Sequence, residues 1–311
     1  MKKINTTFIS GLLYEHDLQL KTTGENSKNP GTEYISGTIS IATDDAVTNI
    51  VPVHFTYVTS KTAKGNGNAT FNLLSDIING TVKSVMEHGQ EVANKLRIDS
   101  AIGLNDFYTN RDGEETLVSA KRNEGGFVHT TKDLDKKESN RNTFTVDMLI
   151  TGVRRIEEDV EKELPEKMIV KGEIFDFRGS LLPVEFTALN PDAMDYFESL
   201  EPSQKNPVFT RVWGNQVSTV IKSKRVTKSA FGEDMVREVQ SNRKDWVITG
   251  ANPEPYEFDT EKTITAEEVK KARADREIYL AEVKQRYQEY QASKGVAATA
   301  KAPVKKGDFN F

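Results

Sequence analysis

The chain has 311 residues, of which 36% are hydrophobic and 29% are charged, and its formal net charge is −5. This composition is typical of a hydrophilic globular protein with room for two domains. The absence of cysteine excludes disulfides, thiolate catalysis and cysteine metal sites. No apolar run approaches the roughly 18 residues of a membrane span, and the negative total argues against a uniformly basic nucleic-acid coat.

The first unit, residues 1–142, begins with short strand-like segments that carry glycines. A helical spacing of apolar residues follows, and then two extended segments flank the turn Asn110–Gly113. In chain order these predicted elements are Ile9–Gly11, Ile35–Ile41, Val51–Thr56, the helix Phe71–Ile78, Lys95–Tyr108 and Leu117–His129.

The polar segment 131–142 connects this unit to a second one, residues 143–258, which repeats the same order of elements. A proline in the first turn marks the predicted helix of the second unit. The predicted elements here are Ile150–Gly152, Val170–Phe177, Leu182–Thr187, the helix Pro191–Leu200, Pro207–Trp213, Val217–Val226 and Asp245–Thr249. The acid-rich segment Glu157–Glu166 falls in the loop between the first two strands, where it is solvated, opposes a basic stretch of a neighbouring subunit or discourages duplex DNA.

A repeat of this length indicates one small β-domain used twice. Three strands, a helix and two further strands is the order of the oligonucleotide-binding (OB) barrel. Gly37 and Gly172 lie inside strands, where a small barrel must bend sharply. The sequence therefore predicts a mainly β protein with two tandem OB-fold barrels, each with a short helix.

Residues 259–292 are predicted to form a C-terminal helix that opens with the capping box Thr265–Glu268. An apolar seam at Leu280, Val283, Tyr287 and Tyr290 is expected to dock on the second domain, with a coiled-coil partner as the alternative. Residues 293–311 are rich in Ala, Lys, Pro and Gly, which predicts a disordered tail that ends in Asp308, Phe309 and Phe311.

An OB barrel followed by a flexible tail with a terminal Phe resembles the single-stranded-DNA-binding proteins of bacteria and their viruses. The repeated glycine and Pro-Val runs (Val51–Val53 and Leu182–Val184) and the segment Ser119–Phe127 are similar to tandem-barrel versions from tailed bacteriophages. Family tips carry several acids, whereas here Lys305 and Lys306 precede Asp308.

The resemblance implies a non-enzymatic protein that coats single-stranded DNA during phage DNA replication, recombination or repair in the bacterial cytoplasm. It also implies that Asp308, Phe309 and Phe311 recruit a partner such as a polymerase, primase, helicase or recombinase. No cofactor is expected, and the sequence leaves homo-oligomer formation open.

Sequence-tolerant binding of a single strand needs cations for phosphates and flat side chains for bases. Residues 202–232 contain no acid, and a strand would place Phe209, Arg211 and Trp213 on one face. The alternative is that both aromatic rings belong to the core. The predicted single-strand-binding residues of this domain are Phe209, Arg211, Trp213, Lys222, Lys224, Arg225 and Lys228.

In the first domain the predicted binding residues surround the second hairpin. Lys121 and Arg122 precede Gly125-Gly126, where a backbone can approach a phosphate closely, although an ordinary charged hairpin edge explains them equally well. The predicted set is Arg97, Tyr108, Arg111, Lys121, Arg122 and Phe127.

Catalysis has no support in the sequence. The four histidines are scattered without ligand spacing, and no phosphate-binding glycine loop, nucleophile elbow or HExxH motif occurs. A binding module is therefore favoured. The rival interpretation is a structural or interaction protein, such as a virion component that uses the barrels as adhesive modules, and the least favoured is an enzyme fragment.

Overall fold

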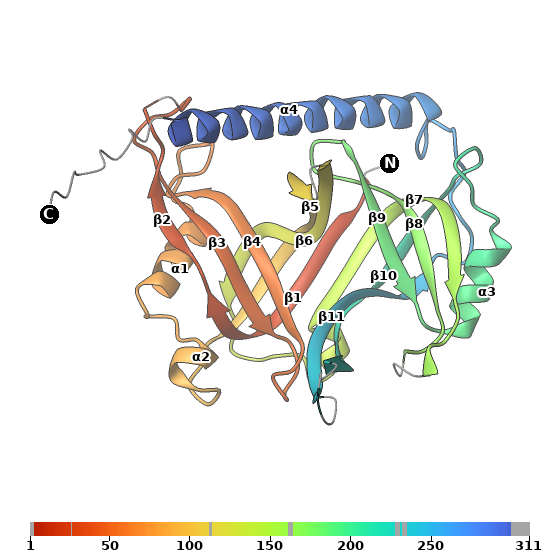
Figure 1. Ribbon diagram of the computed structural model, residues 1–311, viewed down its shortest axis with the longest axis horizontal. Helices are drawn as coiled ribbons and strands as arrows, with labels where there is room; N and C mark the ends of the chain where they lie inside the picture. Colours follow the sequence, from red (N-terminus) through yellow and green to blue (C-terminus); the bar gives the residue numbers. More distant parts are fainter. Residues whose placement is uncertain are drawn as a thin grey trace, which may run out of the picture.

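The computed structural model describes residues 3–25, 27–111, 114–160, 164–227, 231 and 235–299 (Figure 1). Within these ranges the side chains of residues 111, 219–227, 235–243 and 294–299 fall outside the description. The protein consists of two β-barrels that lie side by side, with a long helix across one end of both (Figure 1).

The first barrel closes in the strand order β1-β3-β4-β6-β5-β1. All of its pairings are antiparallel except β4 with β6, and a helix, α1, connects its third and fourth strands. Its elements are β1 (Asn5–His16), β3 (Glu33–Ala42), β4 (Ile50–Thr59), α1 (Ala69–Ile78), β5 (Lys95–Arg111) and β6 (Glu114–Thr130). Two short elements were not predicted, β2 (Gln19–Thr22) and α2 (Val85–His88).

The second barrel repeats this topology in the order β7-β8-β9-β11-β10-β7, again with one parallel pairing, β9 with β11. Its elements are β7 (Asn142–Ile156), β8 (Lys167–Phe175), β9 (Leu181–Ala188), α3 (Pro191–Ser199), β10 (Val208–Thr227) and β11 (Met235–Ala251). Both closed orders are those of the OB-fold, so the predicted tandem barrels are confirmed.

The predicted strands after α3 are wrong in two places. The last one, predicted as Asp245–Thr249, is the much longer β11, which starts at Met235. Residues 207–213 and 217–226 form the single strand β10, because Gly214 absorbs a shift of register against β11 without ending the ladder. A side chain at Gly214 would collide with the carbonyl oxygen of Val247, so only glycine allows this close approach of the two strands.

Each barrel holds an apolar core, built from the inward positions of its strands and closed by its helix, and the second core also includes Ile102 and Leu104 of β5. Leu74 and Ile77 of α1 pack into the first core, and Met194 and Phe197 of α3 pack into the second. Gly37 has a φ of +133°, a conformation that favours glycine, and lies against Asp17 at a break in the β3–β4 register. The predicted bend is therefore present at Gly37.

The two barrels share a β-ladder. Residues 5–9 of β1 pair antiparallel with residues 142–146 of β7, so the walls of both barrels continue into each other (Figure 1). The side chain of Asn5 reinforces the junction, because its amide exchanges hydrogen bonds with the backbone of Ile102 and donates to the carbonyl oxygen of Phe175 at 3.0 Å. The barrels are thus joined by main-chain pairing as well as by the covalent connector.

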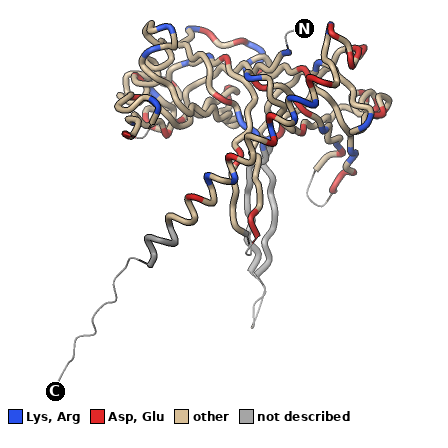
Figure 2. The backbone as a smooth tube through the Cα atoms, turned by 90° about the horizontal axis from the view of Figure 1, so that it is seen from above, with Lys and Arg blue, Asp and Glu red and all other residues tan. Residues whose placement is uncertain are grey.

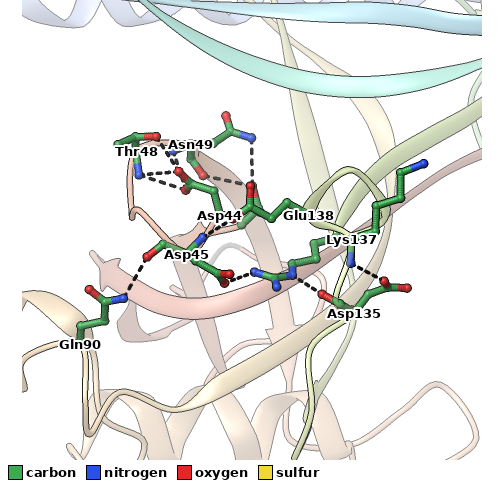
Figure 3. A network of polar contacts seen from close by, with 10 residues as sticks. Asp44, Asp45, Thr48, Asn49, Gln90, Asp135, Lys137 and Glu138 are labelled. Atoms are coloured by element: carbon green, nitrogen blue, oxygen red, sulfur yellow. Dashed lines mark hydrogen bonds and ion pairs between the residues drawn. The ribbon is translucent and has the colours of Figure 1, made fainter.

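The connector between the barrels is tied to the β3–β4 loop by charged hydrogen bonds (Figure 3). The backbone N–H of Asp45 donates to Glu138 Oε1 at 2.7 Å. The buried Arg141 donates from Nη1 to Asp45 Oδ1 at 2.5 Å and from Nε to the carbonyl oxygen of Asp135 at 2.6 Å. This polar segment is consequently an ordered part of the junction.

The C-terminal helix α4 (Ala266–Thr299) begins with the predicted capping box. Glu268 N–H donates to Thr265 Oγ1 at 3.2 Å, and Thr265 N–H donates to Glu268 Oε2 at 3.0 Å. Val269 and Ala272 join a small apolar cluster on the outside of the second barrel. Among the described residues, no helix combines the length and the apolar character that crossing a membrane would need.

The expectation that the helical seam docks on the second domain is wrong for its later half. Arg276 forms two hydrogen bonds with Asp106 of β5, at 2.6 and 2.7 Å, and the Tyr287 ring lies 6.0 Å from that of Tyr108 on the same strand. α4 therefore bridges the second barrel and the β5–β6 hairpin of the first, and it runs outward from the body (Figure 2).

Candidate nucleic-acid interface

The junction creates one continuous outer surface that crosses five strands, and we call it the shared face. Through the strand registers, Phe127 of β6, Asp99 of β5, Phe8 of β1, Thr143 of β7 and Asn215 of β10 form a single row. With strands about 4.8 Å apart, this row is roughly 19 Å long. Residues of both barrels thus meet on one surface.

Aromatic and cationic side chains gather on the first-barrel part of the shared face. The Phe127 ring is 70% exposed. The guanidinium of Arg97 lies 5.0 Å from the centre of the Phe8 ring and 3.2 Å from the Asp99 carboxylate. Of the predicted residues, Arg97 and Phe127 are therefore brought close together, beside a third residue, Phe8, that the sequence reasoning missed.

Trp213 lies on the second-barrel part of the same face, opposite Thr145 of β7. Its indole rests over Gly250 of β11. Any side chain at position 250 would collide with the ring, so the glycine makes room for it. Trp213 keeps 39% of its surface exposed. It is thus held against the sheet while part of its surface remains free for contact, in agreement with the prediction that it faces outward.

Arg211, predicted to contact phosphate, is engaged inside the protein. Its guanidinium donates to both carboxylate oxygens of the fully buried Asp147, at 2.8 and 3.2 Å, and these hydrogen bonds raise the pKa of Arg211. Asp147 also accepts from the N–H of Ile4 at 2.8 Å. Arg211 therefore neutralises a buried charge at the junction, which corrects its predicted role.

Phe209 is also corrected, since it is fully buried. It lies on the same side of β10 as Trp213, as predicted, but the chain beyond β11 covers this position. Phe209 packs with Ile264 and Val269, and its ring centre is 5.4 Å from that of Tyr256. No base can stack on a ring sealed in this way.

Lys121 and Arg122 lie away from the shared face, in a cleft between the barrels. Lys121 inserts into the second barrel, where its ammonium donates to the carbonyl oxygen of Glu185 and lies 4.5 Å from the Phe186 ring and 5.0 Å from the Trp246 ring. Burial lowers the pKa of Lys121 to about 7, against the opposing effects of Asp245 and Glu185. Lys121 therefore fixes the hairpin to the neighbouring barrel and offers no free charge to a phosphate.

The Gly125-Gly126 pair and Tyr108 are likewise occupied within the protein. A side chain at Gly126 would collide with the carbonyl oxygen of Asp99, so this glycine admits the neighbouring strand β5 in place of the predicted phosphate. Tyr108 packs against Tyr287 of α4, and the ammonium of Lys284 lies 6.0 Å from its ring. Tyr108 thus belongs to the docking site of the helix, contrary to its predicted role.

The remaining predicted residues lie outside what the structure describes. Lys222, Lys224 and Arg225 belong to β10 by their backbone, and Arg111 ends β5, but their side chains are not described. Lys228, Asp308, Phe309 and Phe311 lie outside the described residues altogether. Their roles remain predictions.

The cleft between the barrels has a volume of about 830 Å³. The β5–β6 hairpin of the first barrel forms one wall, and the outer surface of β8 and β9 forms the other. A reciprocal pair of amides lies at its edge, in which Asn123 Nδ2 donates to Gln216 Oε1 at 2.8 Å and Gln216 Nε2 donates to Asn123 Oδ1 at 2.9 Å. The hairpin therefore covers part of the outer β8–β9 surface.

Among the residues whose side chains are described, charge alone does not mark a binding site. Lys and Arg alternate with Asp and Glu over both barrels and along α4 (Figure 2). Within the described ranges, no group of three or more His, Asp or Glu side chains gathers in a way that could hold a metal ion. The shared face combines exposed aromatic rings with the cation of Arg97. The available signal for Phe8 was strand alternation, because the inward positions Ile9 and Leu13 place Phe8 on the outward side of β1.

Comparisons with known proteins add a family and a set of distant structures. The model of the YorF family matches residues 3–286. No curated protein sequence matches the chain. Two similar solved structures are of the single-stranded DNA binding protein from Thermus aquaticus, both with 9% sequence identity. A deletion variant has a TM-score of 0.45 and the match covers 84% of this chain and 98% of that one, while the wild type has a TM-score of 0.42 with coverages of 81% and 93%.

Proposed function

The chain belongs to the YorF family, and we propose that it binds single-stranded DNA across the shared face. The observation that carries this proposal is that the shared face joins both barrels and displays Phe8, Phe127 and Trp213 together with Arg97. Such a combination of rings and a cation binds single strands with little regard to sequence, because every base has a flat face.

The rigid junction supports a strand that contacts both barrels at once. The β1–β7 ladder fixes the distance between Phe127 and Trp213, so a bound strand would not have to order two mobile domains. Stacking contributes about 1–3 kcal/mol per base, so a few rings together with the phosphate contacts suffice for useful affinity.

The proposal is tested by titrating a fluorescently labelled oligothymidine with the full chain and measuring anisotropy at several salt concentrations. Affinity should fall steeply with salt, because each neutralised phosphate releases counterions. The double substitution Phe127→Ala with Trp213→Ala should weaken binding by about tenfold or more, given the stacking energy of each ring.

Phe177→Ala is the matched control. Phe177 is 86% exposed in the β8–β9 turn, so its loss removes an exposed ring away from the shared face. Equal effects of the control and the double substitution would contradict the assignment of the shared face. Absence of affinity for single strands at low salt would contradict the function itself and favour a structural or interaction protein.

We further propose that the protein acts without catalysis in the bacterial cytoplasm, coating DNA during phage replication or recombination. The tip residues Asp308, Phe309 and Phe311 are proposed to recruit a replication or recombination enzyme, since a terminal ring and carboxylate can be captured together by one pocket. Removing residues 308–311 should leave DNA affinity unchanged and abolish capture of that enzyme from an infected-cell extract.

A further inference from the structure

The cleft between the barrels has features of a ligand site that the shared face does not use. Its volume of about 830 Å³ lies within the range of small-molecule pockets. Its walls combine apolar surface, including Pro52, Val184 and Trp246, with cationic side chains from both barrels. None of Phe8, Arg97, Phe127 or Trp213 lines it.

Two cations of this cleft, Lys121 and Lys244, have no ion-pair partner among the described residues, and of these Lys121 already donates to the carbonyl oxygen of Glu185. Partial burial lowers the pKa of Lys244, and Glu15 of the first barrel opposes this shift only from a distance. Lys244 is nevertheless exposed to a ligand that enters the cleft, and an ammonium without a close carboxylate gains energy from a bound anion. The position of Lys244 therefore favours a negatively charged ligand.

The other charged groups of the cleft are partly balanced. Lys171 pairs with Glu185 at 3.0 Å, Arg122 pairs with Glu124 at 2.6 Å, and Glu173 pairs with Arg273 at 2.7 Å. Asp245 also lines the cleft. The carboxylates in and around the cleft would repel a ligand with several negative charges. A single phosphate group next to Lys244 leaves the positive and negative charges of the cleft nearly equal.

We propose that the cleft binds a nucleoside monophosphate unit, with its phosphate at Lys244 and its base between the apolar side chains of Pro52 on the first barrel and Val184 on the second. The same unit occurs as a free nucleotide and at the phosphorylated end of a DNA strand. The proposal rests on the cleft alone, so it stands or falls separately from DNA binding on the shared face.

The test uses isothermal titration calorimetry of the full chain with thymidine monophosphate, thymidine and inorganic phosphate. Thymidine monophosphate should bind more tightly than thymidine or inorganic phosphate, because the cleft offers Lys244 to the phosphate and apolar surface to the base. Lys244→Gln should weaken its binding by about tenfold, the usual effect of losing one hydrogen bond to a charged group. Lys28→Gln, which removes an exposed lysine between β2 and β3, should have no effect.

A second arm distinguishes the two sources of the ligand. The Phe127→Ala, Trp213→Ala variant is titrated with a short oligonucleotide that does or does not carry a 5′-phosphate. Tighter binding of the phosphorylated form indicates that the cleft takes a strand end. Binding of the mononucleotide alone indicates that it takes a free nucleotide. As a check that does not depend on charge, Val217→Trp should fill the cleft and abolish binding. The proposal is overturned when neither ligand binds, or when Lys244→Gln binds as the native chain does.

Discussion

Asn123 and Gln216 hold each other through two hydrogen bonds, and this buried pair joins β6 of the first barrel to β10 of the second. Both side chains are buried, and loss of Asn123 removes both of these bonds from the Gln216 amide, whereas Asn123 also donates to the carbonyl oxygen of Pro52 at 3.0 Å. Asn123→Ala should lower the free energy of unfolding by about 1–3 kcal/mol, measured by urea denaturation. Asn66→Ala, at an exposed position, serves as the control. Strictly additive losses from Asn123→Ala and Gln216→Ala would show that the pair is not coupled.

A substitution at Arg211 should mainly lower stability, whereas a substitution at Trp213 should mainly weaken DNA binding. Arg211→Met leaves the buried charge of Asp147 with the Ile4 N–H as its remaining hydrogen-bond donor, which should cost about 3 kcal/mol, the lower end for a broken buried pair because Arg211 stays partly exposed. Trp213→Ala should weaken oligonucleotide binding with a smaller effect on stability. Denaturation and anisotropy on both variants test this, and a large loss of affinity in folded Arg211→Met would restore Arg211 to the interface.

Phe209→Ala tests the correction made above for this ring. Removal of a fully buried Phe should lower the free energy of unfolding by about 3–5 kcal/mol. The effect should spread to α4, because Phe209 packs against Val269 of that helix. Hydrogen exchange should therefore accelerate in α4, while oligonucleotide affinity of the folded protein stays the same. Weaker binding without faster exchange would mean that Phe209 faces the DNA after all.

Lys121 predicts a dependence of stability on pH. Its pKa falls from 10.5 in the unfolded chain to about 7 in the folded protein. Between these values the unfolded chain binds a proton that the folded chain lacks, so the contribution of Lys121 to stability rises with pH and is lost as pH falls through about 7. Compared with the native chain, Lys121→Met should show a flatter rise in unfolding free energy from about pH 7 to pH 10. Equal slopes would indicate that Lys121 remains charged in the folded protein, and Lys28→Met is the control.

Local patterns were sufficient to predict the barrels. Three kinds of local pattern carried the prediction: alternating apolar residues, glycines where strands approach closely, and the capping box Thr265–Glu268. Each depends only on residues close in the chain, and together they indicate the order of the strands and the start of the helix. The division of β10 failed because Gly214 and Asn215 resemble a turn, whereas the long partner strand carries the ladder through them.

The site was harder to predict because exposure depends on distant segments. Alternation correctly placed Phe209 and Trp213 on one side of β10, but it does not reveal that residues 256–272 cover Phe209 and leave Trp213 open. Lys121 is similar, since only the packing of the hairpin on the second barrel shows that its ammonium is sealed between Phe186 and Trp246. Phe8 was overlooked because Arg97, the cation that lies over its ring, belongs to another strand far away in the chain.

The ladder between β1 and β7 also has a consequence for synthesis on the ribosome. Residues 5–9 leave the exit tunnel early, and their partners at 142–146 follow only after the whole first barrel has been made. During that interval the edge of β1 in the nascent chain has unpaired backbone N–H and C=O groups. These can pair with the same edge of a neighbouring polypeptide. Expression of residues 1–141 by themselves should therefore yield aggregates or swapped dimers.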